Sequence, residues 1–257
     1  MILPGGRDKI TNEIWKSEKN IFTVDYGGKR MFYRFTPATE TLPHLAPTML
    51  LLHGHGSTNP SRFRNANWNA IAPVDNFGEK NLGSWWVGEN GDFSTQLLLD
   101  EVLNDCAKKI GLDKISNLFI YGSSMGGFGA IMHGQRYDAL AIYANVPQIQ
   151  LLGTTYSEGG MKQYFSKVIG QKNAHVNDLV EYLDNPNLNH PLYFLCENRF
   201  GYKNYRKEHM NRFIQLLESL ELNYHLEIIP TKGHNKNRGI NEVRSLFEQY
   251  CLNGMKE

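Results

Sequence analysis

From residue 48 onward, short apolar runs alternate with longer segments of helical period, and this alternation constrains the fold more than any other feature of the sequence. The apolar runs are 48–53, 68–74, 117–121, 139–146, 191–196 and 224–229. They are apolar at nearly every position, which is typical of strands covered on both faces in a parallel sheet. The segments of helical period are 93–110, 125–135, 205–220 and 240–252. We therefore predict an α/β fold with a mostly parallel sheet and helices on both faces.

The residues before this alternation predict an antiparallel start to the sheet. Residues 21–36 form two alternating runs joined by Gly27-Gly28, which is a signal for a tight β-hairpin. No internal repeat, low-complexity stretch or linker divides the chain, so we expect one domain over residues 1–257. Residues 149–190 are rich in Gly, Asn and Lys, and we expect an insertion there that could act as a cap or lid.

Composition excludes several classes of protein. The chain has 257 residues, 41% of them hydrophobic, which is enough to build a core without metals or disulfides. A formal net charge of +1 argues against a nucleic-acid-binding protein, since such proteins usually carry a basic excess on one face. Three widely spaced cysteines give neither a disulfide framework nor a zinc pattern. No apolar run approaches the ~18 residues of a membrane span and no secretory signal is recognisable, so we expect a soluble, cytoplasmic protein.

The most informative motif is Gly122-Ser123-Ser124-Met125-Gly126, a G-x-S-x-G sequence between an apolar run and a helical segment. A sharp strand-to-helix turn lifts a serine hydroxyl above the sheet, and the flanking glycines leave room for its strained backbone. The helix that begins there presents free N–H groups to developing negative charge. Ser124 is therefore the predicted nucleophile. A dinucleotide-binding turn and a purely structural turn are the alternatives, although the glycine spacing does not fit G-x-G-x-x-G.

A serine nucleophile needs a base, and the base is in turn held by an acid. His234 directly follows the last predicted strand on a Gly/Asn-rich loop, which favours it as the base over a merely solvated histidine. The loop after the preceding strand offers Glu197 as its only carboxylate before Glu208. Glu197 is therefore the predicted acid; the alternatives are a dyad without an acid, or a carboxylate from elsewhere such as Asp75.

The early strand 48–53 ends in a His-Gly-His-Gly sequence, where glycine allows a backbone N–H to turn inward as an oxyanion-hole donor. The predicted donors are the N–H of Met125 and one N–H from His55 or Gly56. An ordinary polar turn is the alternative. His53 and His55 have no nearby cysteine or carboxylate cluster, so we expect no metal site.

Two further stretches are predicted to shape a substrate pocket. Adjacent tryptophans beside amides and carboxylates suit a sugar, whose C–H faces stack on rings while its hydroxyls need fixed polar partners. The candidate residues are Asp75, Asn76, Trp85, Trp86 and Glu89. The alternative is that one tryptophan belongs to the core and the rest form an ordinary turn. Near the predicted acid, Arg199 and Tyr202 belong to a local basic group that could meet a phosphate or carboxylate, or could be a solvated helix start.

The sequences LLHGHGS, SWWVGENGDF and YGSSMGGFGA, followed by a late Gly-His, resemble the α/β-hydrolase superfamily over nearly the whole chain after residue 20. More narrowly, the chain is similar to bacterial surface-glycan O-acetyltransferases of α/β-hydrolase type, including proteins of capsule polysaccharide synthesis and of adhesin-glycan acetylation. Position by position, Ser124 matches the nucleophile and His234 the base. Glu197 matches the acid of those members that use glutamate.

The resemblance implies transfer of an acetyl group from acetyl-CoA to a sugar hydroxyl of a surface polysaccharide, with no tightly bound cofactor. It implies a cytoplasmic enzyme, or one peripheral at the inner face of the membrane, with other capsule-synthesis proteins as partners. A carboxylesterase or deacetylase with the same residues is one alternative. A non-catalytic hydrolase-fold subunit of a glycan-assembly complex is another. The glycan, the acyl group and the oligomeric state stay open.

Overall fold

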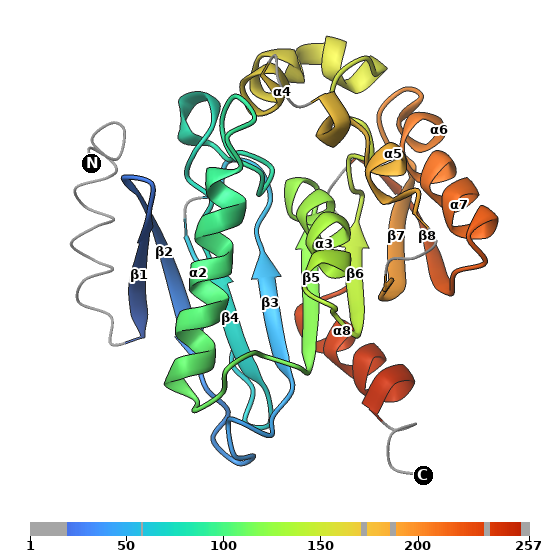
Figure 1. Ribbon diagram of the computed structural model, residues 1–257. Coiled ribbons are helices and arrows are strands. Elements are labelled where there is room, and N and C mark those ends of the chain that lie inside the picture. Colours follow the sequence, from blue (N-terminus) through green and yellow to red (C-terminus); the bar gives the residue numbers. More distant parts are fainter. Residues whose placement is uncertain (1–19, 58, 171–173, 186–188, 234–236, 253–257) are drawn as a thin grey trace.

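An eight-stranded sheet forms the centre of the molecule, in the strand order β1-β2-β4-β3-β5-β6-β7-β8 (Figure 1). The computed structural model describes residues 20–57, 59–170, 174–185, 189–233 and 237–252. The strands are β1 (Ile21–Tyr26), β2 (Lys29–Thr36), β3 (Thr48–Leu52), β4 (Asn69–Pro73), β5 (Leu118–Ser123), β6 (Ala141–Asn145), β7 (Leu192–Phe200) and β8 (Tyr224–Lys232). Each contains or overlaps one of the predicted runs.

The sheet is antiparallel only at its N-terminal edge. β1 pairs with β2, and β2 with β4, in antiparallel register, and every other neighbouring pair is parallel. The turn between β1 and β2 is Gly27-Gly28, with φ of 55° and 75°. Positive φ at both positions is what a two-residue hairpin with the twist of its strands requires, and glycine adopts it without strain. The predicted hairpin and the mostly parallel sheet are confirmed.

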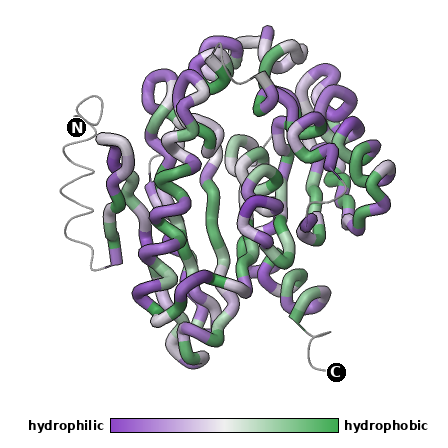
Figure 2. Tube along the Cα trace, in the orientation of Figure 1, coloured by the Kyte–Doolittle hydropathy of each residue, from purple (hydrophilic) through white to green (hydrophobic). Residues whose placement is uncertain are grey.

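Alternate residues of the central strands enter different hydrophobic clusters on the two faces of the sheet. Leu50 and Leu52 of β3 pack in the cluster that also holds residues of α2 (Ser94–Lys109), α3 (Met125–Arg136) and α7 (Met210–Ser219). Met49 and Leu51 pack in the cluster that holds Val243 and Phe247 of α8 (Ile240–Phe247). Because both faces are covered, the central strands are apolar along their length (Figure 2). Helices on both faces are therefore confirmed.

The helical segment predicted at 205–220 is broken in two. α6 (Tyr205–Glu208) and α7 meet at His209, whose φ of −119° and ψ of −83° are not helical. His209 is fully buried, and its Nδ1 accepts hydrogen bonds from the backbone N–H of Ile149 and Gln150 at 3.2 and 3.4 Å. The side chain at the break thus satisfies backbone donors of another loop, a tertiary contact that helical periodicity does not reveal. The predicted helix 240–252 is α8 followed by a π-helical turn, η4 (Glu248–Leu252).

β7 and β8 both run beyond their apolar cores. Their parallel pairing continues to Phe200 and Lys232, and the N–H of Gly233 then donates to the carbonyl of Phe200 at 3.1 Å. β8 is an edge strand with alternating burial, so its outer half lacks the continuous apolar pattern used to predict it. The chain therefore leaves β8 directly beside the end of β7.

The segment between β6 and β7 has its first helical elements beyond the carboxyl ends of the parallel strands (Figure 1, upper part). It contains η2 (Ser157–Met161), α4 (Lys162–Ile169), η3 (Ala174–Asn177) and α5 (Leu179–Leu183). The last elements are the short 3-10 turn η1 (Glu79–Asn81) in the β4–α2 loop and α6, already described. Within the described ranges, no helix combines the length and the apolar character needed to cross a membrane.

Candidate active site

Ser124 is the residue between β5 and α3, and its backbone is left-handed, with φ of 55° and ψ of −117°. A positive φ at a non-glycine residue is uncommon and costs about 1–3 kcal/mol, so the surroundings must hold it in place. The N–H of Ser124 donates to the carbonyl of Asn145 in β6 at 2.8 Å, and its carbonyl accepts from the N–H of Phe128 in α3 at 3.0 Å. Ser124 is half-buried and lies at the carboxyl edge of the sheet, directly after the end of β5.

The glycines flanking Ser124 are required by the space around them. A Cβ on Gly122 would lie 1.9 Å from the carbonyl oxygen of Gly126. A Cβ on Gly126 would lie 2.1 Å from the carbonyl oxygen of Leu52. Both contacts are with backbone atoms, which cannot move aside as a side chain can. The turn therefore meets the steric requirement that the G-x-S-x-G pattern predicts for a nucleophile elbow.

The Ser124 hydroxyl has one described partner, and it is a residue that sequence reasoning missed. Gln148 Nε2 donates to Ser124 Oγ at 3.1 Å. Gln148 follows the end of β6 by three residues and is fully buried. Its only signal in the sequence is its place after a strand whose carboxyl end faces the same edge of the sheet as Ser124.

His234, the predicted base, lies outside the described residues. The residue before it, Gly233, has a φ of 73° and is bonded to Phe200 at the end of β7. The residue before His234 thus lies at the same edge of the sheet as Glu197, at the end of β8, and two strands, β6 and β7, stand between β8 and β5. Its role as base stays a prediction.

Glu197 lies in β7 and is fully buried. By strand register, Ser123, Asn145 and Cys196 are neighbours, so Glu197 is one residue nearer the carboxyl edge than that row. Its Oε1 accepts from the N–H of Asn198 at 2.9 Å, while Oε2 has no hydrogen-bond partner among the described residues. Burial raises the pKa of Glu197 to about 7, against the bond from Asn198 and the charge of Arg206, which lower it. A buried carboxylate oxygen without a partner is what an acid awaiting an imidazole N–H would show.

Asp75, the alternative acid and a predicted substrate contact, is instead an anchor of the β4–α2 loop, residues 74–93. Its carboxylate is fully buried and accepts from the N–H and the hydroxyl of Ser84 at 2.8 and 2.9 Å, and from the N–H of Trp86 at 2.9 Å. The N–H of Asp75 donates to Nε2 of His53 at 2.8 Å. These bonds hold the loop in shape and engage the carboxylate of Asp75, whose roles toward substrate or in the triad stay predictions.

The two tryptophans are also buried in the scaffold, and their predicted contact with a sugar stays a prediction. Trp86 is 0% exposed, and a Cβ on Gly129 of α3 would lie 2.5 Å from its ring. Trp85 is 1% exposed, and its indole N–H donates to Oε1 of Gln148 at 3.0 Å. Both residues have positive φ, at 54° and 62°, so the backbone turns each ring inward. The exposed part of the loop is elsewhere.

The other predicted contacts of this loop have separate environments. Glu89 forms an ion pair with Lys29 at 3.0 Å, which ties the loop to the start of β2, and its contact with substrate stays a prediction. Asn76 is half-buried, and its Oδ1 has no hydrogen-bond partner among the described residues. Asn76 therefore stays a predicted substrate contact.

The loop after β3 lies directly against the Ser124 turn. A Cβ on Gly54 would be 3.3 Å from the carbonyl oxygen of Ser123 and 3.9 Å from Cβ of Ser124. The N–H of Gly56 donates to the carbonyl of Leu82 at 2.7 Å, so it is already engaged. The N–H groups of Met125 and His55 have no such partner within the described part of the chain. The predicted oxyanion donors therefore narrow to Met125 and His55, and Gly56 is set aside because its N–H points to Leu82.

The two histidines of this loop differ. His53 is held by hydrogen bonds at both ring nitrogens, accepting from Asp75 at Nε2 and donating from Nδ1 to the carbonyl of Gly54 at 2.8 Å. An Nε2 that accepts a hydrogen bond belongs to a neutral ring, and burial also lowers the pKa of His53. His55 stacks on Trp85 with ring centroids 5.3 Å apart, and burial lowers its pKa as well. His53 is thus committed to the scaffold and unsuited to proton transfer or metal binding.

A cavity of about 390 Å³ opens near this edge, between η2 and the residues before α6. It is lined by Thr155, Tyr156, Gly159, Gly160, Met161, Tyr202 and Lys203. Tyr202 is 54% exposed and packs on Tyr156, whose ring in turn meets Tyr205 edge-on at 5.2 Å between centroids. Tyr205 contacts Gln148, and Gln148 contacts Ser124, so two side chains separate Tyr156 from the nucleophile. Arg199, the next-to-last residue of β7, is exposed.

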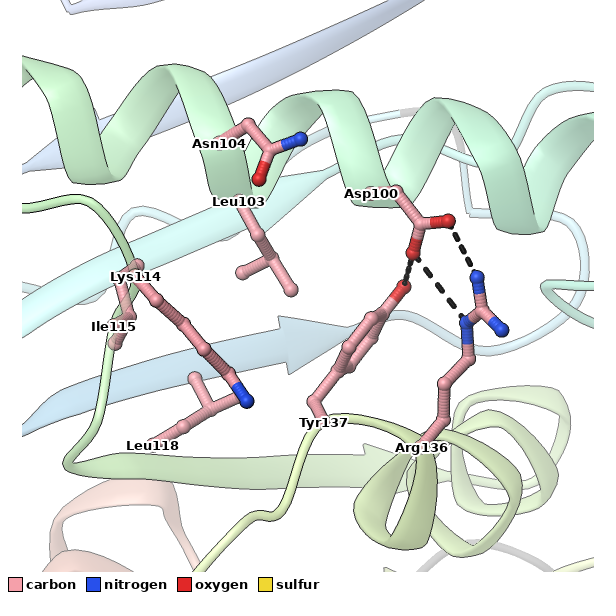
Figure 3. A pocket seen from close by; sticks show the side chains of 8 residues that line it. All are labelled: Asp100, Leu103, Asn104, Lys114, Ile115, Leu118, Arg136 and Tyr137. Carbon is pink, nitrogen blue, oxygen red and sulfur yellow. Dashed lines mark hydrogen bonds and ion pairs between the residues drawn. The ribbon is translucent and has the colours of Figure 1, made fainter.

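A second cavity, of about 460 Å³, lies at the other end of the sheet between α2, α3 and the start of β5 (Figure 3). Its polar wall is Asp100, which pairs with Arg136 and accepts from the hydroxyl of Tyr137 at 2.7 Å. Leu118, which lines it, begins β5, whereas Ser124 follows its end. At about 3.3 Å per residue the two ends of this strand are about 16 Å apart, so this cavity is separate from the candidate active site.

Comparison with known proteins gives fold-level matches. No family model and no curated protein sequence matches the chain. Among solved structures, it is similar to the capsule O-acetyltransferase of Neisseria meningitidis serogroup A, with a TM-score of 0.63 and 16% identity over 91% of this chain and 95% of that chain. A histidine-to-alanine variant of that enzyme in complex with CoA aligns with a TM-score of 0.63 and 14% identity, over 92% of this chain and 98% of that one.

The chain is equally similar to a hydrolase. An S-formylglutathione hydrolase from Agrobacterium tumefaciens aligns with a TM-score of 0.65 and 13% identity, over 91% of this chain and 92% of that chain. Identities this low establish the architecture and leave the reaction to the site itself. The strand order, the antiparallel N-terminal hairpin, the serine turn after β5 and these neighbours agree, and the chain has the α/β-hydrolase fold.

Proposed function

We propose that the protein is a serine acyltransferase that moves an acetyl group from acetyl-CoA to a hydroxyl of a surface polysaccharide. The observation that carries the proposal is Ser124, held with a φ of 55° between two sterically required glycines at the start of α3. A residue in that backbone needs an explanation beyond stability, and a raised nucleophile beside free helix N–H groups supplies one.

In the first half-reaction, Ser124 Oγ attacks the thioester carbonyl of acetyl-CoA while His234 accepts its proton. The N–H groups of Met125 and His55 then stabilise the negative oxygen of the tetrahedral intermediate. The carbon–sulfur bond breaks, the CoA thiolate takes the proton from His234, and the acetyl group stays on Ser124 as an ester.

In the second half-reaction, His234 removes a proton from a sugar hydroxyl, which attacks the acetyl ester. The bond between the acetyl carbon and Ser124 Oγ breaks, and the proton returns to Ser124. Glu197 would accept a hydrogen bond from the imidazole through Oε2 and stabilise the imidazolium that forms in each half-reaction. The unpartnered state of Oε2 among the described residues supports this role.

The acceptor would bind in the cavity lined by Tyr156 and Tyr202. Tyrosine rings suit the C–H faces of a sugar, and their hydroxyls, with Lys203 and the exposed Arg199, suit its polar or anionic groups. We propose that the segment between β6 and β7, which supplies Tyr156, acts as a cap over the site. The CoA complex of the structurally similar capsule enzyme supports acetyl-CoA as the donor.

The proposal is tested by measuring CoA release from acetyl-CoA with and without candidate capsule polysaccharides. We expect release that depends on the polysaccharide and is abolished in Ser124→Ala. Ser123→Ala is the matched control, because Ser123 Oγ accepts from Asn145 at 2.9 Å, whereas the bond from Gln148 goes to Ser124. Equal turnover in Ser124→Ala and wild type would overturn the proposal.

A carboxylesterase with water as the acceptor is the second candidate, and the similarity to the S-formylglutathione hydrolase favours it. The same residues would perform the same two steps, with water replacing the sugar hydroxyl. Rapid cleavage of aryl esters without any acetyl transfer to polysaccharide would favour this candidate over the transferase.

A further inference from the structure

The side chain of Gln148 forms hydrogen bonds with three residues around the candidate active site. Its Oε1 accepts from the indole N–H of Trp85 at 3.0 Å, and its Nε2 donates to Tyr205 Oη at 2.9 Å and to Ser124 Oγ at 3.1 Å. The side chain is 0% exposed. It therefore bridges the β4–α2 loop, the start of α6 and the nucleophile turn.

The chemistry of its neighbours fixes which way the amide faces. An indole N–H can only donate, so it must face the amide oxygen of Gln148. The hydroxyl proton of Tyr205 is given to the carbonyl of Val146 at 2.9 Å, so the oxygen of that hydroxyl accepts from Nε2. The second hydrogen of Nε2 is then aimed at Ser124 Oγ. Reversing the amide would set its oxygen against Ser124 and its nitrogen against another donor.

The backbone that places Gln148 is strained. Val146, two residues earlier, has a φ of 43°, which is an outlier for a β-branched residue. It is held there by its N–H, which donates to the carbonyl of Cys196 in β7 at 2.8 Å, and by the bond from Tyr205 to its carbonyl. Strain of this kind persists only where the surroundings hold it, and it is concentrated at functional sites.

We propose that Gln148 is a positioning residue for the nucleophile, an inference that rests on the proposed role of Ser124. Because Oγ accepts a hydrogen bond from Nε2, its own proton is turned away from Gln148 and toward the side from which a base must approach. The same bond fixes the side-chain rotamer of Ser124 before substrate binds. Gln148 does not itself exchange a proton or form a bond with substrate.

The test is the rate of Ser124 modification by a fluorophosphonate, measured from pH 5 to pH 9. Gln148→Met keeps the length of the side chain and removes its donors, and we expect it to lower the rate about 10- to 100-fold, as a misplaced reacting atom does. The control is Gln150→Met, the same substitution two residues away. Gln150 bonds to Arg212 and to the carbonyl of Leu152, outside the site, and this variant should react at the wild-type rate.

Gln148→Glu separates positioning from a structural role. A protonated glutamate can still donate to Ser124, whereas its carboxylate cannot and repels a developing alkoxide. We expect the rate of this variant, relative to wild type, to fall as the pH rises. A ratio that is constant with pH would contradict the inference.

Folding is checked by circular dichroism, and Tyr205→Phe is the second variant should Gln148→Met fail to fold. Tyr205→Phe keeps Gln148 and removes one of the two groups that orient its nitrogen, so a loss of a few-fold is expected. If Gln148→Met and Tyr205→Phe are both labelled at Ser124 at the wild-type rate, the role of Gln148 is overturned and the proposed nucleophile is not. Absence of labelling in the wild type would overturn the proposed nucleophile, and with it this inference.

Discussion

The β4–α2 loop and residues 197–209, which run from the last part of β7 to the break between α6 and α7, lie at the same edge of the sheet. Both carry aromatic and acidic side chains. In the first, Asp75 has its carboxylate oxygens bonded to Ser84 and Trp86, and the two tryptophan rings are buried. In the second, Glu197 Oε2 has no partner among the described residues, and Tyr202 is exposed beside a cavity. The Asp75 carboxylate is thus engaged in holding its loop, whereas Glu197 Oε2 can still accept a hydrogen bond from a ligand or a catalytic partner.

Among the changes that test this comparison, substitution of Trp86 is expected to have the largest effect on the unfolding free energy. Trp86→Ala removes a fully buried ring that packs against Gly129 of α3, and we expect a loss of about 3–5 kcal/mol of unfolding free energy. Urea denaturation monitored by circular dichroism measures it. A loss below about 1 kcal/mol, with substrate binding weakened instead, would restore the tryptophan to a binding role.

The next effect concerns the pH dependence of stability at Glu197. Its pKa is raised from 4.5 to about 7 by burial, so its contribution to stability is fully present below about pH 4.5 and is lost as the pH rises through 7. A shift of this size is worth up to about 3 kcal/mol. We expect the unfolding free energy of a chain with Glu197 to fall over this range relative to one carrying Glu197→Gln.

That measurement is made with His234→Ala in both proteins, so that no imidazolium charge at residue 234 contributes. A difference between the two proteins that does not change from pH 4 to pH 8 would show that Glu197 is not a strained buried acid. It would also remove the contrast with Asp75, whose carboxylate is fully bonded.

The smallest effect on stability is expected at Tyr202. Because its ring is 54% exposed, Tyr202→Ala should change the unfolding free energy by no more than about 0.5 kcal/mol. If the cavity binds the acceptor, the KM for the polysaccharide should rise several-fold while the KM for acetyl-CoA is unchanged. Unchanged kinetics for both substrates would place the acceptor elsewhere.

The sequence was sufficient for the fold because its signals are local. Apolar runs located β3 to β8, and two alternating runs joined by Gly27-Gly28 located β1 and β2. The end of β8 was placed too early, because this edge strand alternates in burial and its last part lacks a continuous apolar pattern. The end of β7 was placed too early because Glu197, Asn198 and Arg199 interrupt its apolar run. The break at His209 was missed, because a bond to the loop after β6 is a tertiary contact.

The candidate site was predicted only in part, for a related reason. Ser124 was identifiable because its strained backbone requires glycines at fixed spacing. The adjacent tryptophans suggested a contact with a sugar, yet both rings are buried in the structure. The backbone N–H of Trp86 donates to Asp75, and the indole N–H of Trp85 donates to Gln148. Gln148 could not be found, since its role depends on three groups that are distant in sequence: Trp85, Ser124 and Tyr205.

The central claim is that Ser124 alone is the reactive nucleophile, and the most direct test is to locate a fluorophosphonate adduct by peptide mass spectrometry. The neighbouring Ser123 lies on the same peptide and makes the measurement discriminating. We predict an adduct in wild type and in Ser123→Ala, and none in Ser124→Ala. An adduct that survives in Ser124→Ala, or its absence from the wild-type protein, would contradict the account.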